Sequence, residues 1–535
     1  MYVQAVLLPG GRPTSAVPLM RPPTTVVAPP EDASFLIKPS EKSYKHQYAN
    51  MYFVRLRALR GFVEQQAKRR WNELAGKPKF VPRVLDVERG ELCFVIGTVY
   101  MEMPLKPNVL DDIARDRSIP APPPKEKFHS DKDSVMLEDE SGRICLVGNR
   151  ILSTCLVTGV ILGALGMETS SGDFEVVDLC FPEMAPQPSA GLAWRTSSSA
   201  SDSMDTGGTH IPTTLASPDE WIALVSGLEV GSANPTDGQV QILAEYLAGE
   251  AGGLDDQSQA ARISRLIIAG DALGSMAAST GVLSGEPEKK SVRVKNTQSI
   301  SMSTNPAQNL AKHLTDVCSS MPVHLLPGAS DPAATILPQQ PLPRSMFGGA
   351  SHYATFHCES NPAYICIQRN DSTASTAGPS DASSSKTKSR VDDSATRTLL
   401  VHSGQPVDDM FKYVPTPPIS RMGLTEATLR WRHMAPTAPD TLWCHPYFAK
   451  DPFVMARTPD IYAVGNQPEF ATKLVEAEGD PNADDKADRL TKRCRIVLLP
   501  KFATSGTLVL VNMRTLSVRR TQFAVERMSA GGGET

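Results

Sequence analysis

Five short segments of this chain place a glycine beside carboxylate, amide, hydroxyl or imidazole side chains directly after an apolar run. They are Ser226-Gly227-Leu228-Glu229, Gly270-Asp271-Ala272-Leu273, Gly328-Ala329-Ser330-Asp331, His402-Ser403-Gly404 and Gly465-Asn466-Gln467-Pro468. In open α/β sheets, ligands collect at the carboxyl ends of the strands, so a site is expected at these turns. Aspartate, asparagine and histidine there would suit a pair of metal ions, which activate water and bind phosphoryl oxygens. The chemistry to test is therefore metal-assisted hydrolysis of a phosphoester.

The order and spacing of the five turns resemble the calcineurin-like metallophosphoesterases, whose strand ends carry DxH, GDxxD, GNHD or GNHE, a lone His, and GHxH. Most of the ligands in those motifs are absent from this chain. The replacements are Gly227 and Glu229 in the first motif, Gly274 in the second, Ala329 and Ser330 in the third, and Asn466 and Pro468 in the fifth. Two aspartates and an asparagine do not make a dinuclear site.

We therefore predict a vestigial pocket with no catalytic residue, no metal and no cofactor. Its residues are Gly227, Glu229, Asp271, Ser330, Asp331, His402 and Asn466. Asp271 and Asp331 are each predicted to cap the turn or helix that follows its strand, because a short carboxylate accepts backbone N–H groups there. His402 at a strand end is predicted to be hydrogen-bonded rather than a metal ligand.

The elements that must position these turns lie between about residue 219 and the end of the chain. Apolar runs predict strands at Trp221–Ser226, Arg265–Ala269, Val323–Leu326, Thr398–Val401, Ile461–Val464, Ile496–Leu499 and Leu508–Val511. Helical patterns at Gln239–Ala248 and Asn305–Ser319 separate the first three. This half is therefore predicted to be an α/β domain, residues 219–535.

The first half has a different pattern. Residues 1–33 have no helical or alternating period and are predicted to be a disordered tail. Residues 34–78 form a helical segment, in which apolar side chains at helical spacing predict an amphipathic helix from Ser40 to Ala75, with a break at Gly61 as one alternative.

Residues 79–190 are predicted to form a small closed β-barrel of the OB type, because five or six short strand runs follow one another. The runs are Val81–Val87, Leu92–Tyr100, Val135–Glu138, Arg143–Val147, Leu156–Leu165 and Glu175–Leu179. A linker at 191–218 and insertions near 274–304 and 371–396 are predicted to be disordered from their composition. The fold class is thus α/β plus β.

Composition excludes several classes of protein. The 54 basic and 58 acidic side chains give a net charge of -4, which argues against a nucleic-acid grip along the whole chain. Nine cysteines with no CxxC pair offer neither a zinc knuckle nor a disulfide framework, and the start of the chain makes a poor signal peptide, so an intracellular location is expected. The longest apolar stretch, Ile151 to Met167, is interpreted as a buried strand and not a membrane span.

Several runs resemble the B-subunits of eukaryotic and archaeal replicative DNA polymerases, which join an OB barrel to an inactive phosphoesterase-like domain. Within that family they are most similar to the small subunits of DNA polymerase delta. The distinctive runs are Leu429-Arg430-Trp431-Arg432-His433, Ala435-Pro436-Thr437-Ala438-Pro439-Asp440-Thr441-Leu442-Trp443 and Val464-Gly465-Asn466-Gln467-Pro468-Glu469-Phe470. The resemblance covers most of residues 34–520. Relatives often have asparagine at the position of Asp271, so a weak single-ion site there stays open.

This resemblance implies a calcineurin-like domain with a four-layer α/β/β/α sandwich, and a scaffold rather than an enzyme. The implied partners are the C-terminal domain of the catalytic subunit of DNA polymerase delta and a third subunit that links to the sliding clamp, so that clamp and DNA are reached indirectly. A further role in translesion polymerase zeta, and a nuclear location in DNA replication and repair, are also implied.

Two other functions remain as alternatives. The OB barrel could lead a module that binds single-stranded DNA, although its strand runs carry few aromatic residues, and a residual metal-dependent phosphoesterase would need ligands that the sequence lacks. Trp431 and Trp443 are equally well interpreted as core residues or as anchors of a protein interface.

Overall fold

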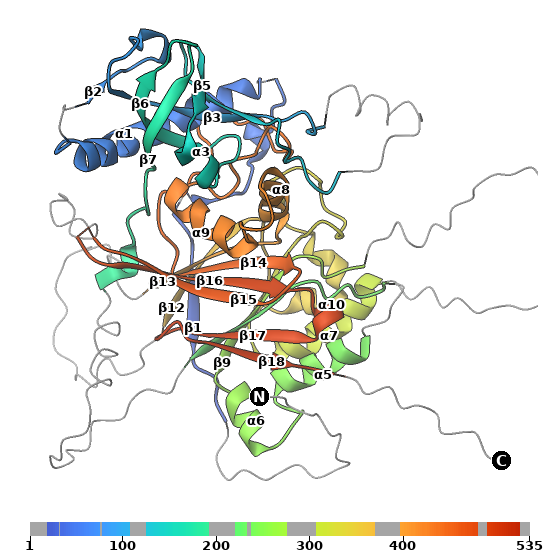
Figure 1. Ribbon diagram of the computed structural model, residues 1–535. Helices are drawn as coiled ribbons and strands as arrows, with labels where there is room; N and C mark the ends of the chain where they lie inside the picture. Colours follow the sequence, from blue (N-terminus) through green and yellow to red (C-terminus); the bar gives the residue numbers. More distant parts are fainter. Residues whose placement is uncertain are drawn as a thin grey trace, which may run out of the picture.

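The chain folds into a small β-barrel, a long helix beside it, and a larger domain built on two packed sheets (Figure 1). The computed structural model describes residues 19–30, 33–45, 47–74, 78–107, 125–191, 220–232, 237–274, 306–369, 396–479 and 489–524. The predicted linker at 191–218 and the two predicted insertions lie almost entirely outside the described residues.

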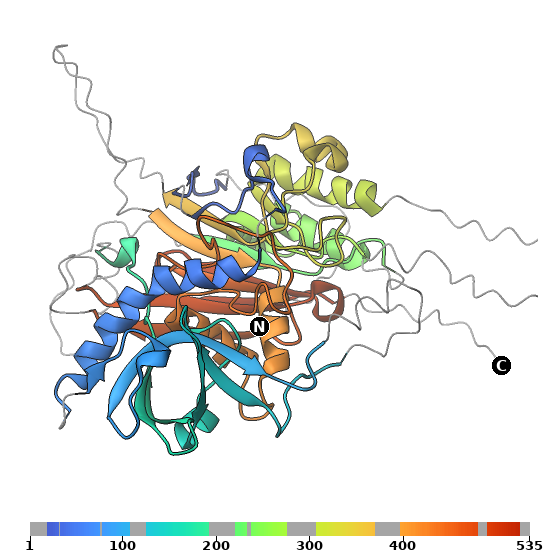
Figure 2. The same cartoon turned by 90° about the horizontal axis from the view of Figure 1, so that it is seen from above.

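The barrel closes because a strand near one end of the sheet also pairs with the strand at the other end. Its strands are β2 (Lys79–Phe80), β3 (Cys93–Glu102), β4 (Ser134–Glu138), β5 (Arg143–Val147), β6 (Ile161–Glu168) and β7 (Phe174–Cys180). The order β2-β3-β4-β5-β7-β6 is completed by antiparallel pairing of β3 with β6. Figure 2 shows the barrel end-on as a ring of blue and teal strands. A closed barrel was predicted, and the structure has one.

Two of the strand predictions in the barrel were wrong in detail. The apolar stretch from Ile151 to Met167 begins with the short helix α3 (Asn149–Ser153), and β6 starts only at Ile161. The turn between them includes Gly159 with φ +89°, whereas the residues of a regular strand have negative φ. The run Val81–Val87 contains a 3-10 turn, Val84–Asp86, instead of a strand. Apolar content alone therefore fixed neither the backbone nor the burial of these segments, since Leu85 and Leu152 are exposed.

Helix α1 (Ala49–Trp71) lies along the barrel and is continuous through Gly61. Its buried residues recur mostly every three or four positions, as a helix with one apolar face requires: Met51, Arg55, Leu56, Leu59, Val63, Ala67 and Trp71. Gly61 lies on the outer side, where a Cβ would meet nothing within 4 Å. The helix ends at Trp71, whose Nε1 donates to Asp178 of the barrel at 2.9 Å.

The larger domain contains two six-stranded sheets packed face to face. One has the order β1-β12-β13-β14-β16-β15: β1 (Thr24–Val27), β12 (Ala363–Arg369), β13 (Thr396–His402), β14 (Ile461–Gln467), β16 (Lys492–Pro500) and β15 (Ala471–Ala477). The other has the order β11-β10-β9-β8-β17-β18: β11 (Phe356–Cys358), β10 (Val323–Leu326), β9 (Ile263–Ala269), β8 (Trp221–Val225), β17 (Thr507–Asn512) and β18 (Val518–Gln522).

Helices cover the outer face of each sheet, so the layers run helix, sheet, sheet, helix (Figure 1). Leu399 and Val401 face the other sheet, whereas Leu400 between them faces the helical layer, as the two-residue period of a strand demands. One layer contains α8 (Gln405–Tyr413) and α9 (Arg421–Trp431), and the other contains α5 (Asp237–Ala248), α6 (Leu254–Ala260) and α7 (Pro306–Ser320). A single-turn helix, α10 (Phe502–Ser505), follows β16.

The prediction of a disordered tail through residue 33 was wrong for its last part. Strand β1 pairs antiparallel with β12, so that Thr24 lies opposite Arg369 and Val27 opposite Cys366. Just before it, Arg21 donates to the carbonyl oxygens of Ala260 at 2.6 Å and Ile263 at 2.8 Å. Residues 19–30 thus join both sheets at one side of the domain, and we call them the N-terminal strap.

Two further predictions from the sequence concerned disulfide bonds and membrane-spanning segments. All nine cysteines are free thiols. Among the described helices, none has the length and apolar character needed to cross a bilayer.

Candidate functional site

The five predicted turns come together at one edge of the two sheets. Parallel strands end there in both sheets, which brings turns far apart in sequence into contact. The backbone N–H of Gly227 donates to Gly270 O at 2.9 Å, and that of Asn466 donates to Ser226 Oγ at 2.9 Å. Asn466 Nδ2 also donates to Ser403 O at 2.9 Å. We call this group of turns the strand-end site.

Asp331 is bound by backbone N–H groups on both of its oxygens. Oδ1 accepts from Leu273 at 2.8 Å, and Oδ2 accepts from Gly328 at 2.8 Å and from Ala272 at 3.3 Å. Its side chain is therefore a cap, but mainly for the turn after β9. The prediction placed the cap on the turn after its own strand, β10, where only the Gly328 N–H is bound. Burial raises the pKa of Asp331 to about 6, and the charge of Asp271 adds to that shift against the opposing effect of the backbone donors.

Asp271 in turn caps the turn after β10, whereas the prediction placed its cap on the turn after its own strand, β9. Its Oδ1 accepts the backbone N–H of Ser330 at 2.9 Å, while Ser330 Oγ donates back to Leu273 O at 2.7 Å. Asp271 itself has φ +53° and is buried. Two carboxylates that would be the strongest cation ligands here are thus engaged by the protein backbone.

We expect Asp331→Ala to lower the free energy of unfolding by about 3 kcal/mol, because three buried N–H groups lose their acceptor. The folded pKa of about 6 lies above the usual value near 4, so between these pH values the folded protein binds more protons than the unfolded chain. The contribution of Asp331 to the free energy of unfolding therefore falls as pH rises from about 4 to about 6. The difference in this free energy between wild type and Asp331→Ala should narrow over the same range.

Chemical denaturation at pH 5 and pH 7 measures both effects. The matched control is Asp131→Ala, which removes an exposed carboxylate and should change stability by less than about 0.5 kcal/mol. Equal stability of wild type and Asp331→Ala at both pH values would contradict the capping role.

The position of the first motif holds a cation supplied by the protein. Lys501 Nζ, from the turn after β16, donates to Glu229 Oε1 at 2.6 Å. Burial alone would lower the pKa of Lys501, but the hydrogen bond and charge of Glu229, with Asp271 and Asp408, raise it above its usual value. A permanent ammonium at this position opposes the binding of a metal ion by charge repulsion.

Gly227 makes room for these groups. Its φ is +61°, and a Cβ there would lie 2.7 Å from Asn466 Oδ1 and 2.9 Å from Lys501 Cβ. That Oδ1 is buried and accepts no hydrogen bond from the part of the chain that the structure describes. An aspartate at position 227, as in the active motif, would collide with the lysine and the asparagine.

His402 points away from the strand-end site. Its ring is fully buried in the helical layer, where Nδ1 accepts the backbone N–H of Gly404 at 3.1 Å and Nε2 lies 3.2 Å from Tyr462 Oη. Burial lowers the pKa of His402 to about 3, so the ring is neutral. It therefore does not join the other predicted residues.

A network of amide side chains also lies at this edge and was missed from the sequence. Asn361 Nδ2 donates to Gln339 Oε1 and to Ser403 Oγ, both at 2.7 Å, and Gln339 Nε2 donates to Gly328 O at 3.0 Å. Isolated Asn and Gln in loops give no pattern that would reveal such a network. Lys501 had a usable signal, since it lies two residues after the predicted strand Ile496–Leu499, as other turn residues lie just after theirs.

The described residues contain no group of three or more His, Cys, Asp or Glu side chains arranged to hold a metal ion. At the strand-end site this agrees with the donor set, because Asp271 and Asp331 are capping groups and Glu229 is paired with a lysine. The residues present do not fit a dinuclear centre.

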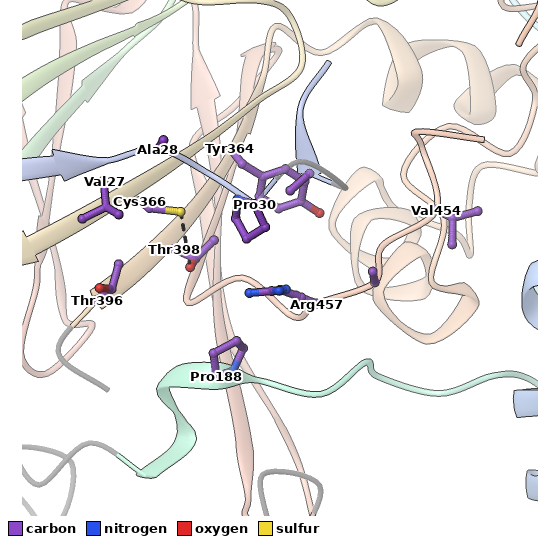
Figure 3. Close-up of a pocket in the computed structure, with 12 residues that line it drawn as sticks. Val27, Ala28, Pro30, Pro188, Tyr364, Cys366, Thr396, Thr398, Val454 and Arg457 are labelled. Carbon is purple, nitrogen blue, oxygen red and sulfur yellow. Dashed lines mark hydrogen bonds between the residues drawn. The ribbon is translucent and has the colours of Figure 1, made fainter. Parts of the chain in front are cut away.

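A separate cavity of about 140 Å³ lies beside β1 (Figure 3). Its lining is mainly apolar, with Tyr364, Cys366 and Pro30 on one side and Arg457 on another. The Sγ of Cys366 lies 3.9 Å from Thr398 Oγ1. This volume is below the roughly 300 Å³ at which small-molecule sites begin, and its lining includes no carboxylate or imidazole. It is therefore a poor candidate for catalysis.

Comparison with known proteins assigns the two halves. Residues 47–179 match the family described as the DNA polymerase delta subunit OB-fold domain, and residues 222–472 match the family of the DNA polymerase alpha/epsilon B-subunits. The DNA polymerase delta small subunit of rice is 33% identical over 487 residues, which are 90% of this chain and 94% of the relative. This chain belongs to the DNA polymerase delta small-subunit family. The family resemblance seen in the sequence is thus confirmed.

Other members of the delta small-subunit family agree. The small subunits of Arabidopsis thaliana and Saccharomyces cerevisiae are each 32% identical and cover 90% and 91% of this chain. The barrel is thus an OB fold, and the chain is a non-catalytic polymerase subunit of DNA replication, as the sequence predicted.

Proposed function

We propose that this chain is a scaffold of DNA polymerase delta, which binds the C-terminal domain of the catalytic subunit and a third subunit that links to the sliding clamp. The observation that carries this proposal is the strand-end site, where Asp271, Asp331 and Glu229 are all engaged by groups of the chain itself. Because its strand-end carboxylates are already engaged in this way, the large α/β domain is suited to binding other proteins through its surface and not to catalysis.

We also infer that the two-sheet domain is an inactive relative of the calcineurin-like phosphoesterases. Its layer order of helix, sheet, sheet, helix and the meeting of five turns at the carboxyl ends of its strands support this. The vestigial pocket then consists of turn-forming groups, with His402 directed elsewhere. A role shared with translesion polymerase zeta, a nuclear location and a part in DNA repair complete the proposal.

The decisive experiment is affinity purification of the tagged full chain from its own cells, with identification of the bound proteins. We expect the catalytic and third subunits of DNA polymerase delta in near-equal amounts, because the interfaces of permanent complexes are large and more apolar than those of transient ones. An untagged extract is the control. Recovery of the chain without any large polymerase subunit would overturn the scaffold proposal.

Metal dependence gives an independent prediction. Pure protein with Mn²⁺ should hydrolyse a generic phosphodiester no faster than buffer, and Mn²⁺ should shift the melting temperature by less than about 1 °C, because an ion that is not bound cannot stabilise the fold. Asp271→Ala should behave like wild type in the hydrolysis assay. Hydrolysis stimulated by Mn²⁺ and abolished by Asp271→Ala would instead favour a residual phosphoesterase.

A further inference from the structure

Four aromatic side chains are exposed on one face of the molecule. Trp443 is 62% exposed, Phe448 61%, Tyr44 67% and Tyr48 46%. A contiguous group of exposed aromatic rings marks an interaction site, and each ring can bury about 150–250 Å². Trp431, the other tryptophan that the sequence singled out, is only 2% exposed and belongs to the core.

The four rings form one patch although they come from two distant segments. The ring of Tyr44 lies 5.3 Å from that of His445, which sits between Trp443 and Phe448 in the chain. On the other side, Asn50 Nδ2 donates to Phe448 O at 2.8 Å, and Asn50 is two residues beyond Tyr48. We call this group of Tyr44, Tyr48, Trp443 and Phe448 the aromatic patch.

The patch is held by a fixed backbone. Leu337 N donates to Trp443 O at 3.0 Å, and His445 N donates to Leu337 O at 2.8 Å. Between them the side chain of Cys444 is fully buried, with its Sγ 3.7 Å from Met51 Sδ, so neighbouring Trp443 is directed outward. Rings presented on a rigid support lose little conformational entropy when they bind.

Charge around the patch is mainly positive. Lys42 and Lys45 flank Tyr44, and Lys450 follows Phe448 by two residues. All three are exposed, and among the described residues 41–50 and 441–450 the one exposed acid is Glu41. The chain as a whole carries a net charge of -4. A local basic rim on an acidic protein complements a local acidic segment, whereas a continuous phosphate backbone would also meet the repulsive overall charge.

We propose that the aromatic patch docks another subunit of the polymerase, through apolar side chains ringed by acidic residues on that subunit. This inference rests on the proposed scaffold function and assigns it a surface. Trp and Tyr are the residue types that most often dominate binding energy at protein interfaces, and here they cluster within a charged rim. Single-stranded DNA, which also stacks on aromatic rings, is tested as the competing occupant.

The test uses the full chain and the variant Trp443→Ser/Phe448→Ser. Equilibrium binding is measured separately with the purified catalytic subunit, with the third subunit and with a labelled single-stranded oligonucleotide. We expect at least about a tenfold increase in Kd for one of the two subunits, and no change in melting temperature because both side chains are exposed. Lys42→Glu/Lys45→Glu should weaken the same complex more at low salt than at high salt.

The matched control is Leu152→Ser/Val177→Ser, which removes two similarly exposed apolar side chains from the barrel, 86% and 57% exposed. It should leave both subunit affinities within about twofold of wild type. If wild type binds a subunit and the patch variant binds it equally well, the patch is wrong while the scaffold stands. If wild type binds neither subunit, both proposals are wrong. Loss of oligonucleotide binding alone would replace the protein partner with DNA.

Discussion

Replacing Arg55 by methionine should lower the free energy of unfolding by about 3 to 5 kcal/mol, because a buried carboxylate would lose its charge partner. Arg55 Nε lies 2.8 Å from Asp451 Oδ2, and neither side chain is exposed. The guanidinium also donates to Pro436 O at 2.7 Å and Ala438 O at 2.6 Å. Methionine keeps the helix propensity and the apolar stem of the side chain, so the loss reports on the charged group.

The same substitution should change the acid stability. Burial alone would raise the pKa of Asp451, but Arg55 and His433 hold it well below its usual range. A carboxylate with a depressed folded pKa contributes stability that is present above its unfolded pKa near 4 and lost as pH falls through the folded value. Without Arg55 the folded pKa rises, so Arg55→Met should begin to unfold at a higher pH than wild type.

Chemical denaturation at pH 7 and an acid titration followed by circular dichroism measure these effects. Arg57→Met is the control, since Arg57 lies on the exposed side of the same helix and should change stability by less than about 0.5 kcal/mol. Asp451→Asn and the double variant give the coupling energy of the pair. A loss below about 1 kcal/mol in Arg55→Met would show that the pair is not a main link between helix and domain.

Gly159→Ala should be the second severe change, with a loss of about 3 kcal/mol or more. Gly159 has φ +89°, and a Cβ there would lie 1.9 Å from Pro436 O and 2.4 Å from Arg55 Nη1. The first atom is backbone and cannot yield without moving the barrel away from the two-sheet domain. The effect therefore combines local strain with damage to the contact between the two parts of the chain.

Gly172→Ala separates those two contributions. Gly172 has nearly the same φ, +88°, but a Cβ there would meet nothing within 4 Å. Its substitution should cost only the strain of a side chain at positive φ, about 1 to 2 kcal/mol. Chemical denaturation of both variants gives the difference, and limited proteolysis reports whether the barrel separates. Equal losses in the two variants would mean that the contact at Pro436 is easily relieved.

Local patterns predicted much of this fold. The turns of the strand-end site were found because each follows an apolar run in the chain. The helical period also identified most of the buried face of α1, but the helix predicted from Ser40 starts only at Ala49, and Tyr48 and Phe53, which were placed on the apolar face, are exposed. The orientation of His402 was only partly available: in β13 it has the same parity as Leu400, so the two side chains share a face. That this face meets the helical layer is known only from the packing of the two sheets.

Other features could not be read from local patterns. A charged residue such as Arg55 is expected on the exposed side of a helix. It is buried because it pairs with Asp451, which lies 396 positions later in the chain. The strand Thr24–Val27 is too short to show a period and depends on a distant partner. The pairing of Glu229 with Lys501 likewise requires the two sheets to be packed, because the residues lie 272 positions apart.

The position of the N-terminal strap in the chain affects when its sheet can form during protein synthesis. Thr24 is made early, but its partner Arg369 follows roughly 345 residues later, and at about 5–20 residues per second that takes roughly 17 to 70 seconds. Throughout this interval β1 lacks its native partner strand. A segment of only four residues, half of them threonine, is poorly suited to form a stable sheet with the wrong partner. Because β1 is so short, we expect it to stay unpaired until its partner strand β12 has been synthesised.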